Sequence, residues 1–141
     1  MGIVEAGVAG KVAIVTGATR GIGQAIALAY AAAGIKVAVV SRSAADCEQA
    51  ALAIRKTGGE AMAAPCDVTR IEEFRLLVDR VVERWGKLDI MMNNAGTAIT
   101  RKAIDLSEEE WDRVLDLDLK SVFFCAQAAA RVMIPRKSGK I

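Results

Sequence analysis

The chain has 141 residues, of which 53% are hydrophobic and 26% are charged, so it can bury one core and is not intrinsically disordered. Its 19 basic and 17 acidic residues nearly balance, which argues against binding to nucleic acid or to a membrane surface. The absence of histidine excludes a Ser-His-Asp triad, a Cys-His dyad and a histidine-ligated metal, and we expect no metal site.

The ends and the cysteines fit a single cytoplasmic domain. Residues 1–10 lack the basic start of a signal peptide, so we expect a flexible leader before a domain over residues 11–141. No apolar run approaches the length of about 18 residues that a membrane-crossing helix needs. Cys47, Cys66 and Cys125 are widely spaced and form no CxxC pair, which predicts reduced thiols, with Cys125 packed in the core.

The predicted elements alternate between strands and helices from the start of this domain. Residues 11–15 form a short apolar run typical of a buried strand, and a glycine-rich turn follows over 16–23. An alanine-rich helix is predicted over 22–33 and ends at Gly34. A second buried strand follows at 36–40, and a helix over 43–57 begins with the capping residue Ser43.

The same alternation continues through the second half. A weaker third strand is predicted at 61–65, and Thr69 with Glu72 has the spacing of a capping box that opens a helix to residue 85. A fourth strand is predicted at 88–92. Ser107 and Glu110 form a second capping-box pattern, which opens a long helix to residue 134. Residues 140–141 look like the first step of a fifth strand.

This order of elements predicts an α/β fold. We expect a Rossmann-type, doubly wound parallel sheet with right-handed crossovers, which this chain follows as far as the start of its fifth strand. Because the strands are continuously apolar, helices should cover both faces of the sheet. Ligands of open α/β sheets bind beyond the carboxyl ends of the strands, so the turns after the strands are the candidate site.

The glycine-rich turn carries the first sign of a ligand. Gly17, Gly21 and Gly23 lie between a strand and a helix, where backbone N–H groups and the helix dipole favour a pyrophosphate and a Cβ would hold the backbone away from it. Their spacing, G-x-x-x-G-x-G, is not that of a P-loop, which also needs a Gly-Lys-Ser/Thr sequence. We therefore predict nucleotide binding, with a tight structural turn as the alternative.

The end of the second strand indicates which dinucleotide is bound. An acidic residue at this point binds the ribose 2′-OH of NAD, whereas an arginine accommodates the 2′-phosphate of NADP. The strand is followed by Ser41, Arg42 and Ser43, and no acid occurs until Asp46. Arg42, supplemented by the two serines and by Arg20 of the glycine turn, predicts NADP(H) in preference to NAD(H). In the alternative interpretation both arginines are solvated surface charges.

Together, three motifs resemble those of the short-chain dehydrogenase/reductase family. Residues 16–23 (TGATRGIG) match its T-G-x-x-x-G-I-G motif, Asp67 after the third strand matches the acid that contacts adenine, and residues 93–96 (NNAG) match the motif that shapes the cofactor pocket. Within the family, the chain is most similar to NADP-dependent 3-oxoacyl carrier-protein reductases and polyol dehydrogenases. The predicted cofactor residues are Gly17, Thr19, Arg20, Gly21, Ile22, Gly23, Ser41, Arg42, Asp67, Val68, Asn94, Ala95 and Gly96.

The resemblance also reveals what this sequence lacks. It implies a catalytic tyrosine with a lysine four residues later, and an upstream serine that orients the substrate. Tyr30, the only tyrosine, lies in the first helix and is followed four residues later by Gly34. The family's serine and Tyr-x-x-x-Lys come after the fifth strand. Because a tyrosine needs a nearby cation to transfer protons near neutrality, we expect no catalysis by this chain alone.

Three functional interpretations follow from that expectation. The first is the N-terminal NADP(H)-binding part of an oxidoreductase that transfers a hydride between nicotinamide and a small carbonyl or alcohol substrate. The second is a non-catalytic NADP-binding or regulatory module that pairs with a full-length relative. The third is a truncated protein without a function of its own.

The long helix departs from the family at one position. The family's asparagine falls at Asp118, which helical spacing places on one apolar face with Trp111 and Leu115. Asp118 then either alters a proton relay or makes a structural bond to nearby backbone, and we prefer the second interpretation. After Leu117 the helix is apolar nearly all round, which predicts burial on every side. The resemblance implies that residues 108–134 pair with a second copy in a homo-oligomer.

Overall fold

The four strands form one parallel sheet in the order β3-β2-β1-β4 in the computed structural model, which describes residues 7–141. At its centre, β1 (Val12–Thr16) pairs with β2 (Lys36–Val40) and β4 (Ile90–Met92), while β3 (Ala61–Ala63) pairs with β2. Ala13 lies opposite both Val37 and Ile90, so the strands run in register. The predicted Rossmann-type order is confirmed.

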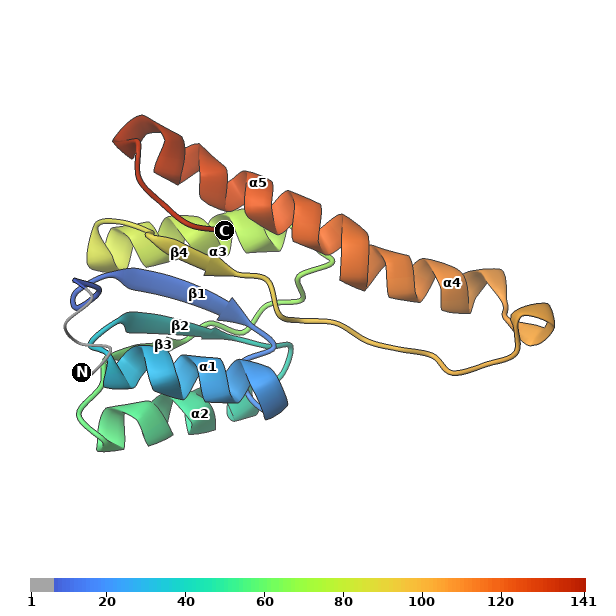
Figure 1. Cartoon of the computed structure of the whole chain (residues 1–141), viewed down its shortest axis with the longest axis horizontal. Coiled ribbons are helices and arrows are strands. Elements are labelled where there is room, and N and C mark those ends of the chain that lie inside the picture. Colours follow the sequence, from blue (N-terminus) through green and yellow to red (C-terminus); the bar gives the residue numbers. More distant parts are fainter. Residues whose placement is uncertain (1–6) are drawn as a thin grey trace.

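Helices cover both faces of this sheet, as predicted (Figure 1). On one face lie α1 (Gly21–Ala32) and α2 (Ala44–Lys56), and on the other lie α3 (Ile71–Trp85) and α5 (Ser121–Met133). Alternate side chains of β1 supply the two cores: Val12 and Ile14 pack with residues of α3 and α5, and Val15 packs with residues of α1 and α2. Within residues 7–141 no helix is long and apolar enough to cross a membrane.

The helix ends follow the predicted signals with one exception. Ser43 caps α2 by accepting the Asp46 N–H, and Gly34 and Gly86 follow α1 and α3 with φ of +80° and +79°. The capping box predicted at Thr69 is wrong. The Thr69 hydroxyl and N–H both donate to Oδ1 of Asp67, at 2.7 and 3.0 Å, so α3 begins later, at Ile71, without a side-chain cap.

The long helix exists, but its middle is not α-helical. It comprises α4 (Glu108–Leu115), a π-helical turn η3 (Asp116–Lys120), α5 and a short 3₁₀ turn (Ile134–Arg136). Both hydrogen bonds of the Ser107–Glu110 capping box are present, as predicted. Figure 1 shows α4 extending past the sheet, joined to β4 by a long connection that holds the 3₁₀ turn Ala103–Asp105. We call residues 97–115 the arm.

The long helix is less buried than its apolar sequence suggests, and the burial on every side that we predicted after Leu117 is wrong. Because the arm projects beyond the sheet, Trp111 is 55% exposed and no residue of α4 is buried. In α5 only one side faces the core: Cys125 and Ala129 are buried, whereas Phe123 is 61% exposed. The apolar helix therefore presents an uncovered face in this structure.

At the amino ends of the strands, the buried carboxylate of Asp89 links β1 to the residues before β4. Asp89 accepts hydrogen bonds from the Val12 N–H at 2.9 Å and from Nη2 of Arg136 at 2.9 Å, and Nζ of Lys87 lies 3.2 Å away. β4 begins at Ile90, two residues later than predicted, although the Asp89 N–H still donates to the Val12 carbonyl at 2.9 Å. Lys140 forms a parallel bridge with Ile90, which confirms the predicted first step of a fifth strand beside β4.

The start of the chain is described only in part. Residues 1–6 of the predicted leader lie outside the described residues. The rest of that segment contacts the domain, because the Gly10 N–H donates to the Gly34 carbonyl at 2.9 Å.

Candidate functional site

Four loops meet at the carboxyl edge of the sheet: residues 16–23, 41–43, 64–70 and 93–97. Three hydrogen bonds link each loop to a neighbouring loop or to the end of the neighbouring strand. Cys66 N–H donates to the Ser41 carbonyl at 2.8 Å, Ala18 N–H to the Val40 carbonyl at 3.2 Å, and Nδ2 of Asn94 to the Thr16 carbonyl at 3.0 Å. Every residue predicted to bind the cofactor lies on one of these loops or in the first turn of α1.

The glycine turn has a conformation and internal contacts that require glycine. Gly17 and Gly21 have φ of +63° and +56°, in the region that favours glycine. A Cβ on Gly17 would lie 3.0 Å from Nδ2 of Asn94, and one on Gly23 would overlap the Gly17 carbonyl, so both glycines permit close packing.

The first turn of α1 is open to an anion. Its N-cap residue, Arg20, makes no side-chain capping bond, and the turn contains no acidic residue. Neither the N-cap side chain nor an acidic side chain of the first turn therefore competes for the backbone N–H groups at this helix end, where the dipole also favours negative charge. Arg20 and Ile22 are exposed beside this turn. The residues present thus fit the diphosphate of a dinucleotide.

Thr16 holds the 93–97 loop against β1, a role that the sequence reasoning missed. Its hydroxyl is buried, accepts the N–H groups of Asn94 and Ala95 at 3.0 Å each, and donates to the Met92 carbonyl at 3.3 Å. Asn94 in turn donates to the carbonyls of Thr16 and Gly17. The available signal was a hydroxyl residue directly after an apolar strand.

The loop after β2 turns two serines inward and an arginine outward. The Ser43 hydroxyl caps α2, and the Ser41 hydroxyl lies 3.2 Å from Sγ of Cys47 and 3.4 Å from the Ser43 carbonyl. Both serines thus already have partners within the protein, which weakens their predicted part in phosphate binding. Arg42 is exposed and forms no ion pair within residues 7–141, and it remains the best candidate to bind a phosphate here.

Asp67 lies in the loop after β3, near enough to Arg42 for its positive charge to act on the carboxylate. Partial burial tends to raise its pKa, but the hydrogen bonds from Thr69 and the positive charges of Arg42 and Arg70 outweigh burial, and the pKa of Asp67 is lowered. Asp67 is therefore a carboxylate near neutral pH. Oδ1 accepts both bonds from Thr69, which leaves Oδ2 available as an acceptor.

Asp118 lies in the π-helical turn and is exposed, which corrects its predicted place on a buried apolar stripe. Its Oδ1 accepts the Thr97 N–H at 2.8 Å. A Cβ on Gly96 would lie 3.3 Å from the same oxygen. The bond to nearby backbone that we preferred is thus present, and it joins the 93–97 loop to the long helix.

The remaining reactive side chains lie away from this edge or deep in the cores. Tyr30 is half-buried near the end of α1. All three cysteines are buried with free thiols, and burial raises the pKa of Cys66 to about 11 and that of Cys125 to about 12. Neither thiol therefore ionises near neutrality, and Cys125 packs in the core as predicted.

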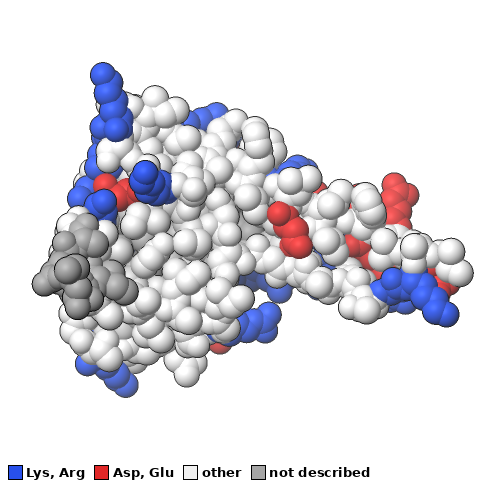
Figure 2. All heavy atoms as spheres, viewed as in Figure 1, with Lys and Arg blue, Asp and Glu red and all other residues white. Residues whose placement is uncertain are grey.

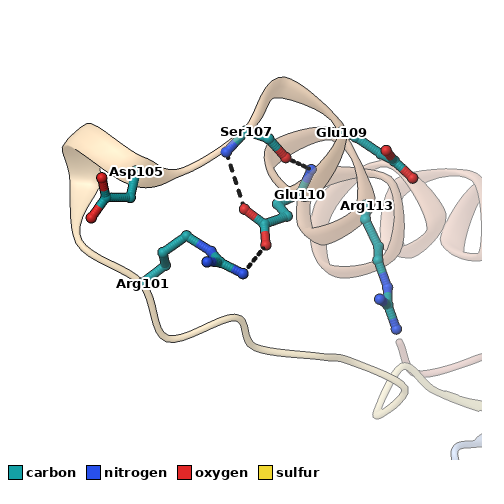
Figure 3. Close-up of a pocket in the computed structure, with 6 residues that line it drawn as sticks. All are labelled: Arg101, Asp105, Ser107, Glu109, Glu110 and Arg113. Carbon is teal, nitrogen blue, oxygen red and sulfur yellow. Dashed lines mark hydrogen bonds and ion pairs between the residues drawn. The ribbon is translucent and has the colours of Figure 1, made fainter.

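A hollow lies on the arm, away from the carboxyl edge of the sheet (Figure 3). Its lining is polar and consists of Arg101, Asp105, Ser107, Glu109, Glu110 and Arg113. Glu110 completes the capping box with Ser107 and pairs with Arg101, and these hydrogen bonds lower the pKa of Glu110. The groups at the centre of this hollow bind one another and cap α4. We therefore assign the hollow a structural role at the start of α4.

Comparison with known proteins identifies the family of this chain. The family described as short chain dehydrogenase matches residues 11–141. A 3-oxoacyl-[acyl-carrier-protein] reductase of Synechocystis sp. is 39% identical over 132 residues, which cover 93% of this chain and 53% of the relative. The reductase FabG of Staphylococcus aureus is also 39% identical, with 93% and 54% covered. The chain spans about half the length of the curated relatives it matches.

Solved structures have the same fold. A short-chain type dehydrogenase/reductase from Mycobacterium marinum superimposes with a TM-score of 0.90 and 38% identity, covering 96% of this chain and 56% of that one. A metagenomic short-chain oxidoreductase in complex with NADP gives a TM-score of 0.88 and 32% identity, covering 94% and 60%.

Proposed function

The chain belongs to the short-chain dehydrogenase family, and from this premise we propose that it is the N-terminal, NADP(H)-binding part of an oxidoreductase. The complete enzyme would transfer a hydride between nicotinamide and a small carbonyl or alcohol substrate in the cytoplasm. One observation carries this proposal: the uncapped first turn of α1 lies at the same edge as Arg42, with no acid at the end of β2. The relative solved with NADP supports it.

Each carboxyl-edge loop has a distinct part in this proposal. The N–H groups of the first turn of α1 bind the diphosphate, and Gly17 permits the close approach of the 93–97 loop. Arg42 binds the 2′-phosphate through its planar guanidinium, and Oδ2 of Asp67 accepts a hydrogen bond from adenine. Asn94 holds the pocket wall in place. Bound NADP(H) supplies or accepts the hydride.

No residue of this chain takes the part of the catalytic acid. Tyr30 lies on α1, and no lysine follows it at the required spacing. We therefore expect binding without turnover by these 141 residues alone. Reading the gene beyond codon 141 and measuring the intact mass of the natural protein test this point. A serine and a Tyr-x-x-x-Lys in frame support the enzyme, whereas a natural stop codon followed by retained NADPH binding supports the non-catalytic module.

Calorimetric titration with NADPH and NADH tests the choice of cofactor. We expect the natural protein to bind NADPH at least about tenfold more tightly, the difference that one charge-assisted contact provides. Arg42→Ala should remove this preference. Arg113→Ala is the matched control, because Arg113 is an exposed arginine on the arm. Equal dissociation constants for the two cofactors in the natural protein would refute the assignment to NADP(H).

We also propose that the uncovered side of the long helix pairs with a second copy. Leu115, Leu119 and Phe123 recur every fourth residue and are 37%, 64% and 61% exposed. The first turn of α4 is acidic, with residues 108–110 all glutamate, while Arg131 and Arg136 lie near the other end. Figure 2 shows acidic and basic side chains together on the arm, and mainly basic ones at the opposite end of the molecule. In an antiparallel pair the glutamates at the start of α4 would lie toward the end of the partner helix that carries Arg131.

Analytical ultracentrifugation tests this pairing. We expect a dimer or larger assembly for the natural protein, and dissociation when Leu119→Glu and Phe123→Glu place charges in the apolar face. A control, Leu76→Glu, changes a leucine of α3 that is 63% exposed. A natural protein that sediments as a monodisperse monomer would contradict the proposal.

A further inference from the structure

The buried thiol of Cys47 contacts the loop that carries Arg42. Cys47, on the first turns of α2, is fully buried. Its Sγ lies 3.2 Å from the Ser41 hydroxyl and 3.6 Å from the Ser41 carbonyl, to which it can donate. One side chain thus contacts both polar groups of the residue that precedes Arg42.

Residue 41 is also a junction between two loops of the site. Its carbonyl accepts the Cys66 N–H at 2.8 Å, directly before Asp67. Its hydroxyl donates to the Ser43 carbonyl or to the thiol, and Ser43 itself caps α2. Arg42 therefore lies between two residues whose side chains are both held inward, and of these three side chains only its own is exposed.

We propose that Cys47 is a positioning residue for the cofactor's 2′-phosphate and acts through Ser41 to hold Arg42 at the carboxyl edge. The inference rests on the proposed binding of NADP(H). A thiol is a weak donor and a weak acceptor, and in a fully buried position it has no water to bond with instead. Without it, the Ser41 side chain can leave its inward position, and the Arg42 loop gains freedom that phosphate binding must remove again.

Two probes isolate this effect from the rest of the site. Adenosine 2′,5′-bisphosphate carries the 2′-phosphate, and 5′-AMP is the same molecule without it. The ratio of their dissociation constants measures the contribution of the 2′-phosphate alone. Loss of the thiol leaves the backbone bond between Cys66 and Ser41 intact, so adenine binding through Asp67 should persist.

The experiment is calorimetric titration of the complete natural protein and four variants with both probes. Cys47→Ala, and Cys47→Val as the variant that refills the volume, should reduce the preference for the bisphosphate by about fivefold, with 5′-AMP binding changed by less than about twofold. Cys47→Ser, which restores a donor and an acceptor, should recover the preference to within about twofold. Cys125→Ala is the control: this thiol is also buried, and it packs in the core that the sheet forms with α3 and α5.

Three results would overturn the inference. The first is an unchanged ratio in Cys47→Val and Cys47→Ala. The second is an equal fall in Cys125→Ala, because that would trace the effect to general destabilisation. The third is a natural protein that binds both probes equally, which would refute the NADP(H) assignment and this inference with it. An altered ratio confined to the Cys47 variants that lack a polar group supports the positioning role.

Discussion

The Thr16 hydroxyl is the strongest link between β1 and the 93–97 loop, and replacing it without changing the side chain's shape tests how the site is held. Thr16→Val keeps the volume and the β-branching that suits a strand. It removes the acceptor for two N–H groups, those of Asn94 and Ala95, and the donor to the Met92 carbonyl. We expect the 93–97 loop to loosen while β1 stays paired.

The size of the effect depends on the burial of the groups left behind. An unsatisfied buried polar group costs about 1–3 kcal/mol. Asn94 and Ala95 are half-buried, so water can partly replace the hydroxyl, and we take about 1 kcal/mol for each N–H. The free energy of unfolding should fall by about 2 kcal/mol in total. The matched control, Thr16→Ser, keeps the hydroxyl and loses one methyl group, at a cost of about 0.8 kcal/mol.

Two measurements on the natural protein and both variants separate stability from site geometry. Urea unfolding at one protein concentration gives the free energies, and titration with NADPH gives the affinities. We expect Thr16→Val to weaken NADPH binding by about tenfold and Thr16→Ser by less than about threefold. If Thr16→Val binds NADPH as tightly as the natural protein does, the loop keeps its position without the hydroxyl and the reasoning is refuted.

Three further predictions concern other contacts of the fold and the site. Gly23→Ala forces a Cβ into the Gly17 carbonyl and should lower the unfolding free energy by at least about 3 kcal/mol. In Gly21→Ala the Cβ meets open space, and the unfolding free energy should fall by only about 1 kcal/mol because of the φ of +56°. Equal losses in urea unfolding would contradict the packing argument. Asp89→Asn should destabilise the protein by about 1–3 kcal/mol near neutral pH. Burial tends to raise the pKa of Asp89, but hydrogen bonds from Arg136, Val12 and Lys87 outweigh it and lower the pKa, so the stability from this carboxylate is present above its unfolded-state pKa. That stability is lost as the pH falls through the folded-state pKa, so unfolding curves of the two proteins should converge in acid; a constant difference at all pH values would exclude the charge as its source. Asp118→Ala should speed hydrogen exchange at the Thr97 N–H at least about fivefold. Asp118→Asn keeps an acceptor and should leave this exchange rate nearly unchanged. Equal exchange rates in both variants would show that the bond does not hold the loop.

The sequence predicted the sheet and the location of the site because both depend on local patterns. Apolar runs of strand length, glycines at strand ends and serine caps each specify a short segment, and parallel strands then place their carboxyl ends at one edge. The glycine turn could be assigned to an anion in the same way, because positive φ at Gly17 and Gly21 is a property of the residue type.

Contacts between segments far apart in the chain were harder to predict. Thr69 has the right spacing to cap α3, but Asp67, two residues earlier, offers its hydroxyl a charged acceptor, and that bond prevails. Thr16 and Cys47 act on residues brought near by the fold, Thr16 across 78 positions of sequence to Asn94. The order of residue types along the chain does not reveal which distant residues the fold brings into contact.

The long helix shows how one local irregularity changes both the site and the surface. In an unbroken α-helix each residue turns the chain by about 100°, so a π-helical turn, which holds one extra residue, rotates the helix before it by about that angle relative to the helix after it. The face that joins Trp111 and Leu115 to the buried Cys125 in a regular helix is therefore divided at this turn. The same turn contains Asp118 and brings its carboxylate to the Thr97 N–H. Restoring a regular helix by deleting one residue of η3 would thus have to break that bond or turn the apolar face of the arm toward a different side, so the shape of the 93–97 loop and the direction of the proposed pairing surface depend on the same five residues.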